Sequence, residues 1–115
     1  MMKCNTKQVD DVLVIEIEGE IMGGADSESF RNIIYKAIEE DKVFIVADLK
    51  DTTWMNSSGL GILISGLTML RSSGGDLRLT NLSEKVRRPL EITKLESVFL
   101  TYNSIEDAVI SYKTN

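Results

Sequence analysis

Five consecutive apolar residues, Val43–Ala47, stand a few positions before a segment whose large aliphatic side chains recur at helical spacing. A continuously apolar run of this length is typical of a central strand that is covered on both faces, as in parallel sheets. From Leu60 to Leu70, leucine or isoleucine returns every three or four positions, which predicts the core-facing stripe of a helix that begins near Ser57. A buried strand followed by an amphipathic helix is the repeating unit of an α/β fold.

The remaining strands are predicted from shorter patterns. In residues 13–17, leucine or isoleucine occupies every second position and valine or glutamate the positions between, which is the pattern of a half-buried strand. Residues 3–9 precede them across the turn signal Asp10-Asp11, so the two segments are predicted to form an N-terminal hairpin that ends at Gly19. Further strands are expected at residues 77–79 and 98–100.

Three more helices are predicted where a capping residue precedes apolar side chains at helical spacing, and they begin near Asp26, Ser83 and Ser104. Pro89 is expected to kink the third helix or to break it into two short turns. The predicted fold is therefore a single α/β domain, residues 1–115, with an N-terminal β-hairpin, four helices and a mostly parallel sheet of four to five strands joined by right-handed crossovers.

Charge and composition exclude several classes of function. The net charge of −5 disfavours binding to nucleic acid or to an anionic membrane. The chain contains no histidine, so a Ser-His-Asp triad and any histidine metal site are excluded, and no catalytic or metal site is predicted. A lone Cys4, no run of 18 apolar residues and no apolar signal segment at the N-terminus lead us to expect a cytoplasmic protein.

The start of the second helix is unusual. Asn56, Ser57 and Ser58 are residue types whose side-chain oxygens cap free backbone N–H groups, so capping alone is one interpretation of this segment. Gly59 and Gly61 each cost about 1 kcal/mol against alanine inside a helix. Two such glycines in the first turn suggest that another group approaches this backbone closely.

The same helix carries a second stripe without charge, made of Ile62, Ser65, Gly66 and Met69. A helix that is apolar or small on nearly all sides is either buried or presented to a partner. The stripe could therefore pack under a neighbouring helix or bind a partner, and the absence of charge slightly favours the partner.

The sequence Asn56-Ser57-Ser58-Gly59-Leu60-Gly61 resembles the D-S-S/T-G-L-G signature of STAS domains, specifically of the bacterial anti-sigma-factor antagonists. The resemblance extends over nearly the whole chain, through segments similar to the family's G-E-L-D and G-G-x-L-x-L motifs and to its C-terminal third: Gly19–Ile21, Gly74–Leu79, Leu90–Leu95, Val98-Phe99 and Ser104–Ala108. Two positions depart from the family, because Asn56 and Met22 stand where acidic residues are usual.

The resemblance implies a non-enzymatic switch that binds an anti-sigma-factor serine/threonine kinase and thereby frees a sigma factor. In the family, the kinase uses ATP to phosphorylate the serine that corresponds to Ser57, which breaks the complex, and a serine phosphatase resets it. No cofactor, nucleic acid or membrane is expected for this chain, and it is expected to be a monomer or a weak homodimer. The predicted partner-binding residues are Glu20, Met22, Gly23, Gly24, Asn56, Ser58, Gly59, Ile62, Ser65 and Met69.

The sequence is also compatible with other interpretations. Because Asn56 lacks the charge of the family's acidic residue, the domain could be an unphosphorylated scaffold or adaptor, and a third hypothesis is a small-ligand pocket near the sheet edge. Asp48 and Asp51 are only a weak indication of a magnesium-binding site, and a structural role of their carboxylates in the loop is the favoured interpretation. Trp54 is interpreted as a packing anchor that could instead be an interface residue. A basic cluster on the third helix is interpreted as a solvated face: Lys85, Arg87 and Arg88.

Overall fold

The sheet is assembled on its longest strand, β2, which pairs with three other strands. Our computed structural model describes residues 2–113. In it, β1 is antiparallel to β2, whereas β3 and β4 lie parallel to successive parts of β2, β5 is parallel to β3, and β6 is parallel to β5. The strands are β1 (Lys3–Val9), β2 (Val12–Ile21), β3 (Phe44–Asp48), β4 (Thr52–Met55), β5 (Asp76–Thr80) and β6 (Thr101–Tyr102).

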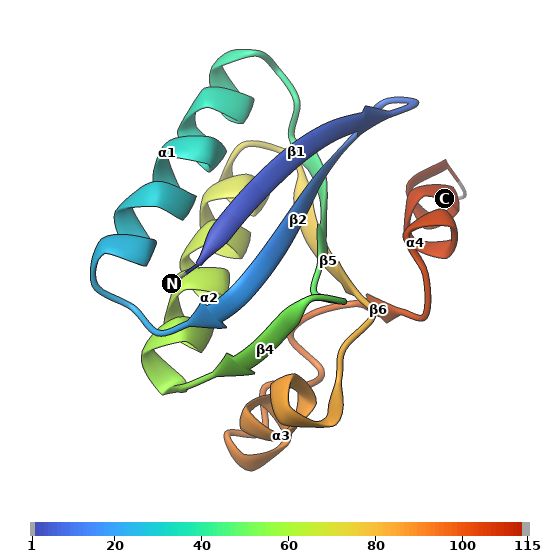
Figure 1. Cartoon of the computed structure of the whole chain (residues 1–115). Helices are drawn as coiled ribbons and strands as arrows, with labels where there is room; N and C mark the ends of the chain where they lie inside the picture. Colours follow the sequence, from blue (N-terminus) through green and yellow to red (C-terminus); the bar gives the residue numbers. More distant parts are fainter. Residues whose placement is uncertain (1, 114–115) are drawn as a thin grey trace.

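Helices cover both faces of this sheet (Figure 1). Helices α1 and α2 lie side by side on one face, α4 lies on the opposite face, and α3 lies next to β4 at the lower edge. Their bounds are α1 (Ala25–Glu39), α2 (Ser57–Ser72), α3 (Glu84–Ile92) and α4 (Ile105–Lys113). The predicted fold class, a mostly parallel α/β domain with an N-terminal hairpin and four helices, is confirmed. Among the described residues, none of the helices combines the length and apolar character needed to cross a membrane.

Strand β3 separates two hydrophobic cores, as its continuous apolar sequence predicted. Ile45 and Ala47 belong to the large core under α1 and α2, and Val46 belongs to the smaller core under α4. All three side chains are fully buried. Because successive residues of a strand point to opposite faces, a strand that is covered twice needs apolar residues at every position.

Three strand predictions were wrong in detail. The sheet has one strand more than predicted, because β4 is only four residues long and has no clear alternation. Gly19 does not end β2; with φ at 88° it lies at an irregularity after which β2 continues beside β4 to Ile21. Val98–Leu100 is a turn, in which Phe99 is buried from an irregular segment, and the pairing strand follows at Thr101–Tyr102.

Two helix predictions also differ from the structure. Asp26 is not the N-cap of α1; it lies in the first turn, and the cap position belongs to Gly24, which makes no side-chain hydrogen bond. Pro89 neither ends nor divides α3, which runs unbroken from Glu84 to Ile92. A proline removes only one backbone donor, and the buried side chains of Val86 and Leu90 hold the turns on either side of it against the core.

The C-terminus of α2 has the glycine signal that its sequence predicted. Gly74 adopts φ of 86°, a left-handed conformation that favours glycine. The N–H of Gly75 donates to the carbonyl of Leu70 at 2.8 Å, and the N–H of Gly74 donates to that of Arg71 at 3.2 Å. This pair of bonds is a Schellman motif, which satisfies the last carbonyl groups of the helix.

The thiol of Cys4 lies on β1, half buried against the main core. Burial, with a smaller effect from the negative charge of Asp26, raises its pKa from 9.0 to about 11. A thiol reacts as its thiolate, so at pH 8 the folded protein should react with Ellman's reagent about a hundredfold more slowly than the urea-unfolded protein. Since the folded-state pKa is raised, the stabilisation from the neutral thiol is present below about pH 9 and is lost as the pH rises toward 11.

Cys4 is the sole cysteine, so the absorbance of the released reagent reports this one site. A folded protein that reacted as fast as the unfolded chain would contradict the described packing of β1.

Candidate functional site

Ser57 is the first residue of α2, and its side chain is exposed. The capping role belongs to its neighbour: the backbone of Asn56 is extended, and its Oδ1 accepts a hydrogen bond from the N–H of Gly59 at 2.7 Å. Within residues 2–113, no hydrogen bond occupies the hydroxyl of Ser57. The interpretation that Ser57 itself caps the helix is therefore wrong, and its hydroxyl is left available at the surface.

The glycine that follows the two serines is required by the fold. A Cβ atom on Gly59 would lie 1.8 Å from the carbonyl oxygen of Ile21, at the end of β2. The N–H of Asn56 donates to this same oxygen at 3.4 Å. The close approach predicted for the first turn of α2 is therefore an internal contact at Gly59, whereas a Cβ on the exposed Gly61 would meet nothing within 4 Å.

The loop after β2 lies beside the two serines. Gly23 has φ of 96°, and a Cβ atom on it would lie 2.9 Å from the Cβ of Ser58. The side chain of Met22 is 39% exposed, and the position around Gly24 is open. The structure thus brings the predicted loop residues and the predicted phosphorylation site together on one surface, although they lie more than 30 positions apart in the sequence.

The uncharged stripe of α2 is mainly a helix-packing surface. Ile62 is only 5% exposed and lies in the main core, where a partner could not reach it. A Cβ on Gly66 would lie 2.7 Å from the ring of Phe30, which shows how closely α1 covers this face. Placing Ile62 on an open surface was therefore wrong; the absence of charge reflects burial under α1. Ser65 is exposed and Met69 is half buried at the edge of this contact.

Glu20 lies in strand β2, where it pairs with Trp54 of β4, one residue beyond Gly19, at which the hairpin was predicted to end. Both side chains are exposed, Trp54 by 42%, so Trp54 is not a packing anchor. They line a groove of about 710 Å³ that runs between β4 and α3 and reaches the start of α2. Its lining consists of Glu20, Thr53, Trp54, Met55, Ser57, Lys85, Arg88, Pro89, Ile92 and Thr93.

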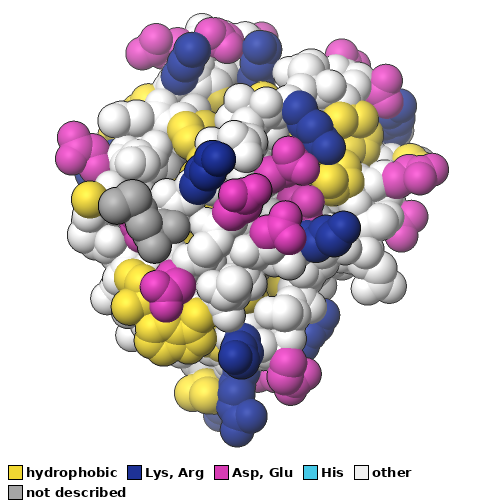
Figure 2. Space-filling view, viewed as in Figure 1, with side chains coloured by type: hydrophobic (Ala, Val, Ile, Leu, Met, Phe, Trp, Pro, Cys, Tyr) yellow, Lys and Arg dark blue, Asp and Glu magenta, His cyan; other side chains and the backbone are white. Residues whose placement is uncertain are grey.

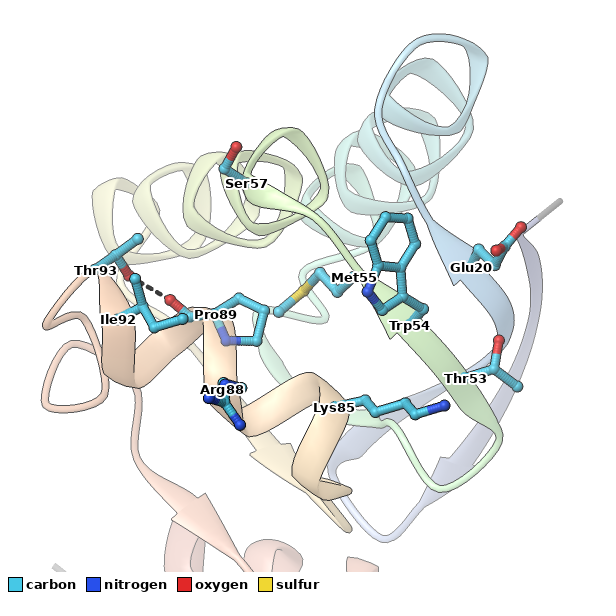
Figure 3. Close-up of a pocket in the computed structure, with 10 residues that line it drawn as sticks. All are labelled: Glu20, Thr53, Trp54, Met55, Ser57, Lys85, Arg88, Pro89, Ile92 and Thr93. Atoms are coloured by element: carbon cyan, nitrogen blue, oxygen red, sulfur yellow. Dashed lines mark hydrogen bonds between the residues drawn. The ribbon is translucent and has the colours of Figure 1, made fainter.

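Figure 3 shows how these side chains are arranged. Met55 and Pro89 point toward each other, and Ser57 lies at one end with its oxygen directed away from the other labelled residues. On the molecular surface, hydrophobic side chains gather in the lower left of Figure 2, over the region of β4, with an acidic group beside them and basic groups below. The sequence suggested only a small-ligand pocket near the sheet edge and did not locate this groove, because the floor of the groove is strand β4, which was not predicted. The outward-facing Ile92, 71% exposed, follows from the continuation of α3 through Pro89.

The carboxylate of Asp48 has a structural role, as the favoured interpretation of this residue stated. It is buried, and its Oδ1 accepts hydrogen bonds from the N–H of Lys50 at 3.2 Å, the hydroxyl of Thr80 at 3.4 Å and the amide of Asn81 at 2.9 Å. These bonds join the carboxyl ends of β3 and β5. Across residues 2–113, no three acidic or cysteine side chains come close enough to one another to hold a metal ion.

Comparison with known proteins identifies the family. The STAS domain model matches residues 3–108. BtrV of Bordetella bronchiseptica, provisionally named an anti-sigma factor antagonist, is 27% identical over 98% of this chain and 97% of its own. The anti-sigma-B factor antagonist of Bacillus subtilis is 42% identical over 44% of this chain and 46% of its own.

Solved structures agree with these sequence matches. A protein of Thermotoga maritima, also provisionally named an anti-sigma factor antagonist, is 26% identical and superimposes with a TM-score of 0.86 over 96% of this chain and 94% of its own. A sulfate transporter family protein of Wolinella succinogenes shares the fold at 16% identity, with a TM-score of 0.78 over 91% of this chain and 87% of that protein. The chain belongs to the STAS domain family, and both sequence relatives described above carry the name of an anti-sigma factor antagonist, BtrV provisionally.

Proposed function

We propose that this STAS domain is an anti-sigma-factor antagonist that binds an anti-sigma-factor serine kinase and is released when the kinase phosphorylates Ser57. The observation that carries the proposal is the position of Ser57. It is the first residue of a 16-residue helix, its hydroxyl is exposed, and the capping bond that would otherwise occupy such a hydroxyl is made by Asn56. A hydroxyl in this position can enter a kinase active site without any loss of hydrogen bonds in the fold.

The surroundings of Ser57 explain how one phosphate would act as a switch. A phosphoserine carries a charge of about −1.5 to −2, which the positive N-terminal end of α2 stabilises. On the side of the loop after β2, the neighbouring residues Met22, Gly23 and Ser58 carry no charge. A partner docked on this surface would have to accommodate a doubly charged group at the centre of the contact, so phosphorylation removes the partner and leaves the fold intact.

The docking surface that we propose is smaller than the sequence predicted. It includes the loop Met22–Gly24, the exposed Ser58 and the edge of α2 at Ser65 and Met69. Glu20 also belongs to it, at the place where this surface meets the groove. Gly59 supports this surface from below, and Ile62 is a core residue.

The other components of the switch follow from the same proposal. The kinase uses ATP as the phosphate donor, a serine phosphatase removes the phosphate, and the sequestered kinase no longer holds its sigma factor. The antagonist acts in the cytoplasm as a binding protein, without a cofactor of its own.

One feature favours a second candidate function, an unphosphorylated scaffold. Asn56 supplies the capping oxygen of the family's acidic residue but not its negative charge. In a domain that is no longer phosphorylated, the capping oxygen would still stabilise the fold, whereas the negative charge of the acidic residue would have no function.

Co-elution from a size-exclusion column separates the two functions. The protein is mixed with each anti-sigma-factor kinase of the same genome, without nucleotide, with ADP and with ATP. For a switch, a complex that forms with ADP should disappear with ATP as the antagonist gains one phosphate by mass. A complex that persists with ATP, without any gain in mass, would establish the scaffold and overturn the switch.

A further inference from the structure

The groove between β4 and α3 combines an apolar floor with large hydrophobic side chains that are exposed at its margin. Met55 is buried at its base, and Trp54 and Ile92, 42% and 71% exposed, stand at its margin. A tryptophan and an aliphatic side chain at the edge of a hollow are typical of protein interfaces, where a few such residues supply most of the binding energy. The volume of about 710 Å³ accommodates several side chains of a binding segment.

The groove carries two cations and one carboxylate, Glu20, so its net charge is opposite in sign to that of the protein as a whole. Lys85 and Arg88 lie on the α3 side, in a chain whose net charge is −5. Within the described residues neither cation forms a salt bridge, and neither does Glu20 across the groove. Two unneutralised cations beside an apolar floor complement a segment in which carboxylates adjoin a large apolar side chain.

The groove is continuous with the surface on which the switch is proposed to act, because Ser57 lies at its end. A kinase that places its active site over Ser57 must cover the neighbouring residues, and α3 offers the adjoining hollow. Ser57 presents its oxygen away from the groove, so the groove can hold a partner segment without obstructing phosphate transfer.

We propose that this groove is a second docking site for the kinase, which inserts a short segment carrying a large apolar side chain between Trp54 and Ile92 and acidic side chains against Lys85 and Arg88. The proposal rests on the proposed function and adds to it the chemistry that selects the partner. The Ser57 surface determines whether the complex persists, and the groove determines which kinase binds.

The test uses the kinase that phosphorylates the wild-type protein and measures its dissociation constant by calorimetry in the presence of ADP. Arg88→Glu and Trp54→Ala should each weaken binding about tenfold or more. Arg87→Glu is the matched control, because it makes the same change of charge on the same helix at a residue that does not line the groove. An exposed charge contributes little to binding, so this variant should weaken the affinity by less than about threefold. Circular dichroism before each titration verifies that every variant is folded.

A second readout observes the groove directly. Trp54 is the only tryptophan of the chain, so labelling with fluorotryptophan gives one fluorine NMR resonance from the groove itself. This resonance should shift when unlabelled kinase is added.

The outcomes separate this proposal from the function on which it rests. If the kinase phosphorylates Ser57 but binds the Arg88→Glu and Trp54→Ala variants with wild-type affinity, the groove proposal is overturned and the switch stands. If Arg87→Glu weakens binding as much as Arg88→Glu does, general charge attraction explains the effect and the groove proposal is again overturned. If no kinase binds or modifies the wild-type protein, both proposals fail.

Discussion

The Gly59→Ala variant is expected to lose about 3 kcal/mol or more of its free energy of unfolding, and its melting temperature should fall by about 10 °C or more. The added methyl group would lie 1.8 Å from the carbonyl oxygen of Ile21. This obstacle is a backbone atom of a paired strand, so it cannot rotate away as a side chain would. To admit the methyl group, the first turn of α2 must move off β2, which also strains the hydrogen bond from Asn56 to Ile21.

Gly61→Ala is the matched control for this variant. It makes the same change two residues further along the same helix, where a Cβ atom meets nothing within 4 Å. Here the higher helix propensity of alanine should raise the free energy of unfolding by about 0.5–1 kcal/mol. Thermal and urea unfolding followed by circular dichroism measure both variants, and two glycines of equal effect would contradict the contact between α2 and β2.

Phosphorylation of Ser57 is expected to weaken kinase binding by about a hundredfold or more, because burying a charge of about −2 under a docked partner, beside the uncharged residues Met22, Gly23 and Ser58, costs several kcal/mol. The fold should not weaken. At the N-terminus of α2 the phosphate gains about 0.3–1 kcal/mol from the helix dipole, so the melting temperature should stay constant or rise by a few degrees.

The measurement compares purified phosphoprotein with unmodified protein, by calorimetric titration with kinase and ADP and by scanning calorimetry of each form alone. The two readouts separate a local from a global effect. If binding is lost together with a fall in melting temperature of about 10 °C, phosphorylation acts by unfolding the protein, and the local mechanism is refuted.

The sequence predicted an element of the fold correctly where a single feature of its surroundings, such as burial on both faces, determines its pattern of side chains. Ile45, Val46 and Ala47 are all apolar because this part of β3 is covered on both faces, and the glycine signal after α2 reflects one backbone conformation. The predictions failed where tertiary contacts decide. Strand β4 forms because β2 continues past Gly19 and pairs with it. Helix α3 continues through Pro89 because the turns on either side of the proline pack against the core.

The same distinction applies to the candidate site. Its position at the start of α2 could be predicted from local capping chemistry and from the family resemblance, and the position of the Met22–Gly24 loop could be predicted from that resemblance. Whether the apolar stripe of α2 faced a partner or a neighbouring helix could not, because Ile62 has the same side chain in either environment and only the placement of α1 decides between them. The groove could not be predicted either, since it is formed by two elements that local patterns did not define.

Intact-mass spectrometry shows whether Ser57 is the one phosphate acceptor of the protein. Wild-type protein, Ser57→Ala, Ser58→Ala and Asn56→Asp are incubated with the cognate kinase and ATP, and the gain in mass is followed over time. Our account predicts one phosphate on wild type and on Ser58→Ala, none on Ser57→Ala, and faster transfer in Asn56→Asp, which restores the family's acidic residue while keeping the capping oxygen. A phosphate that persists in Ser57→Ala, or wild-type protein that binds the kinase and gains no mass, would contradict it.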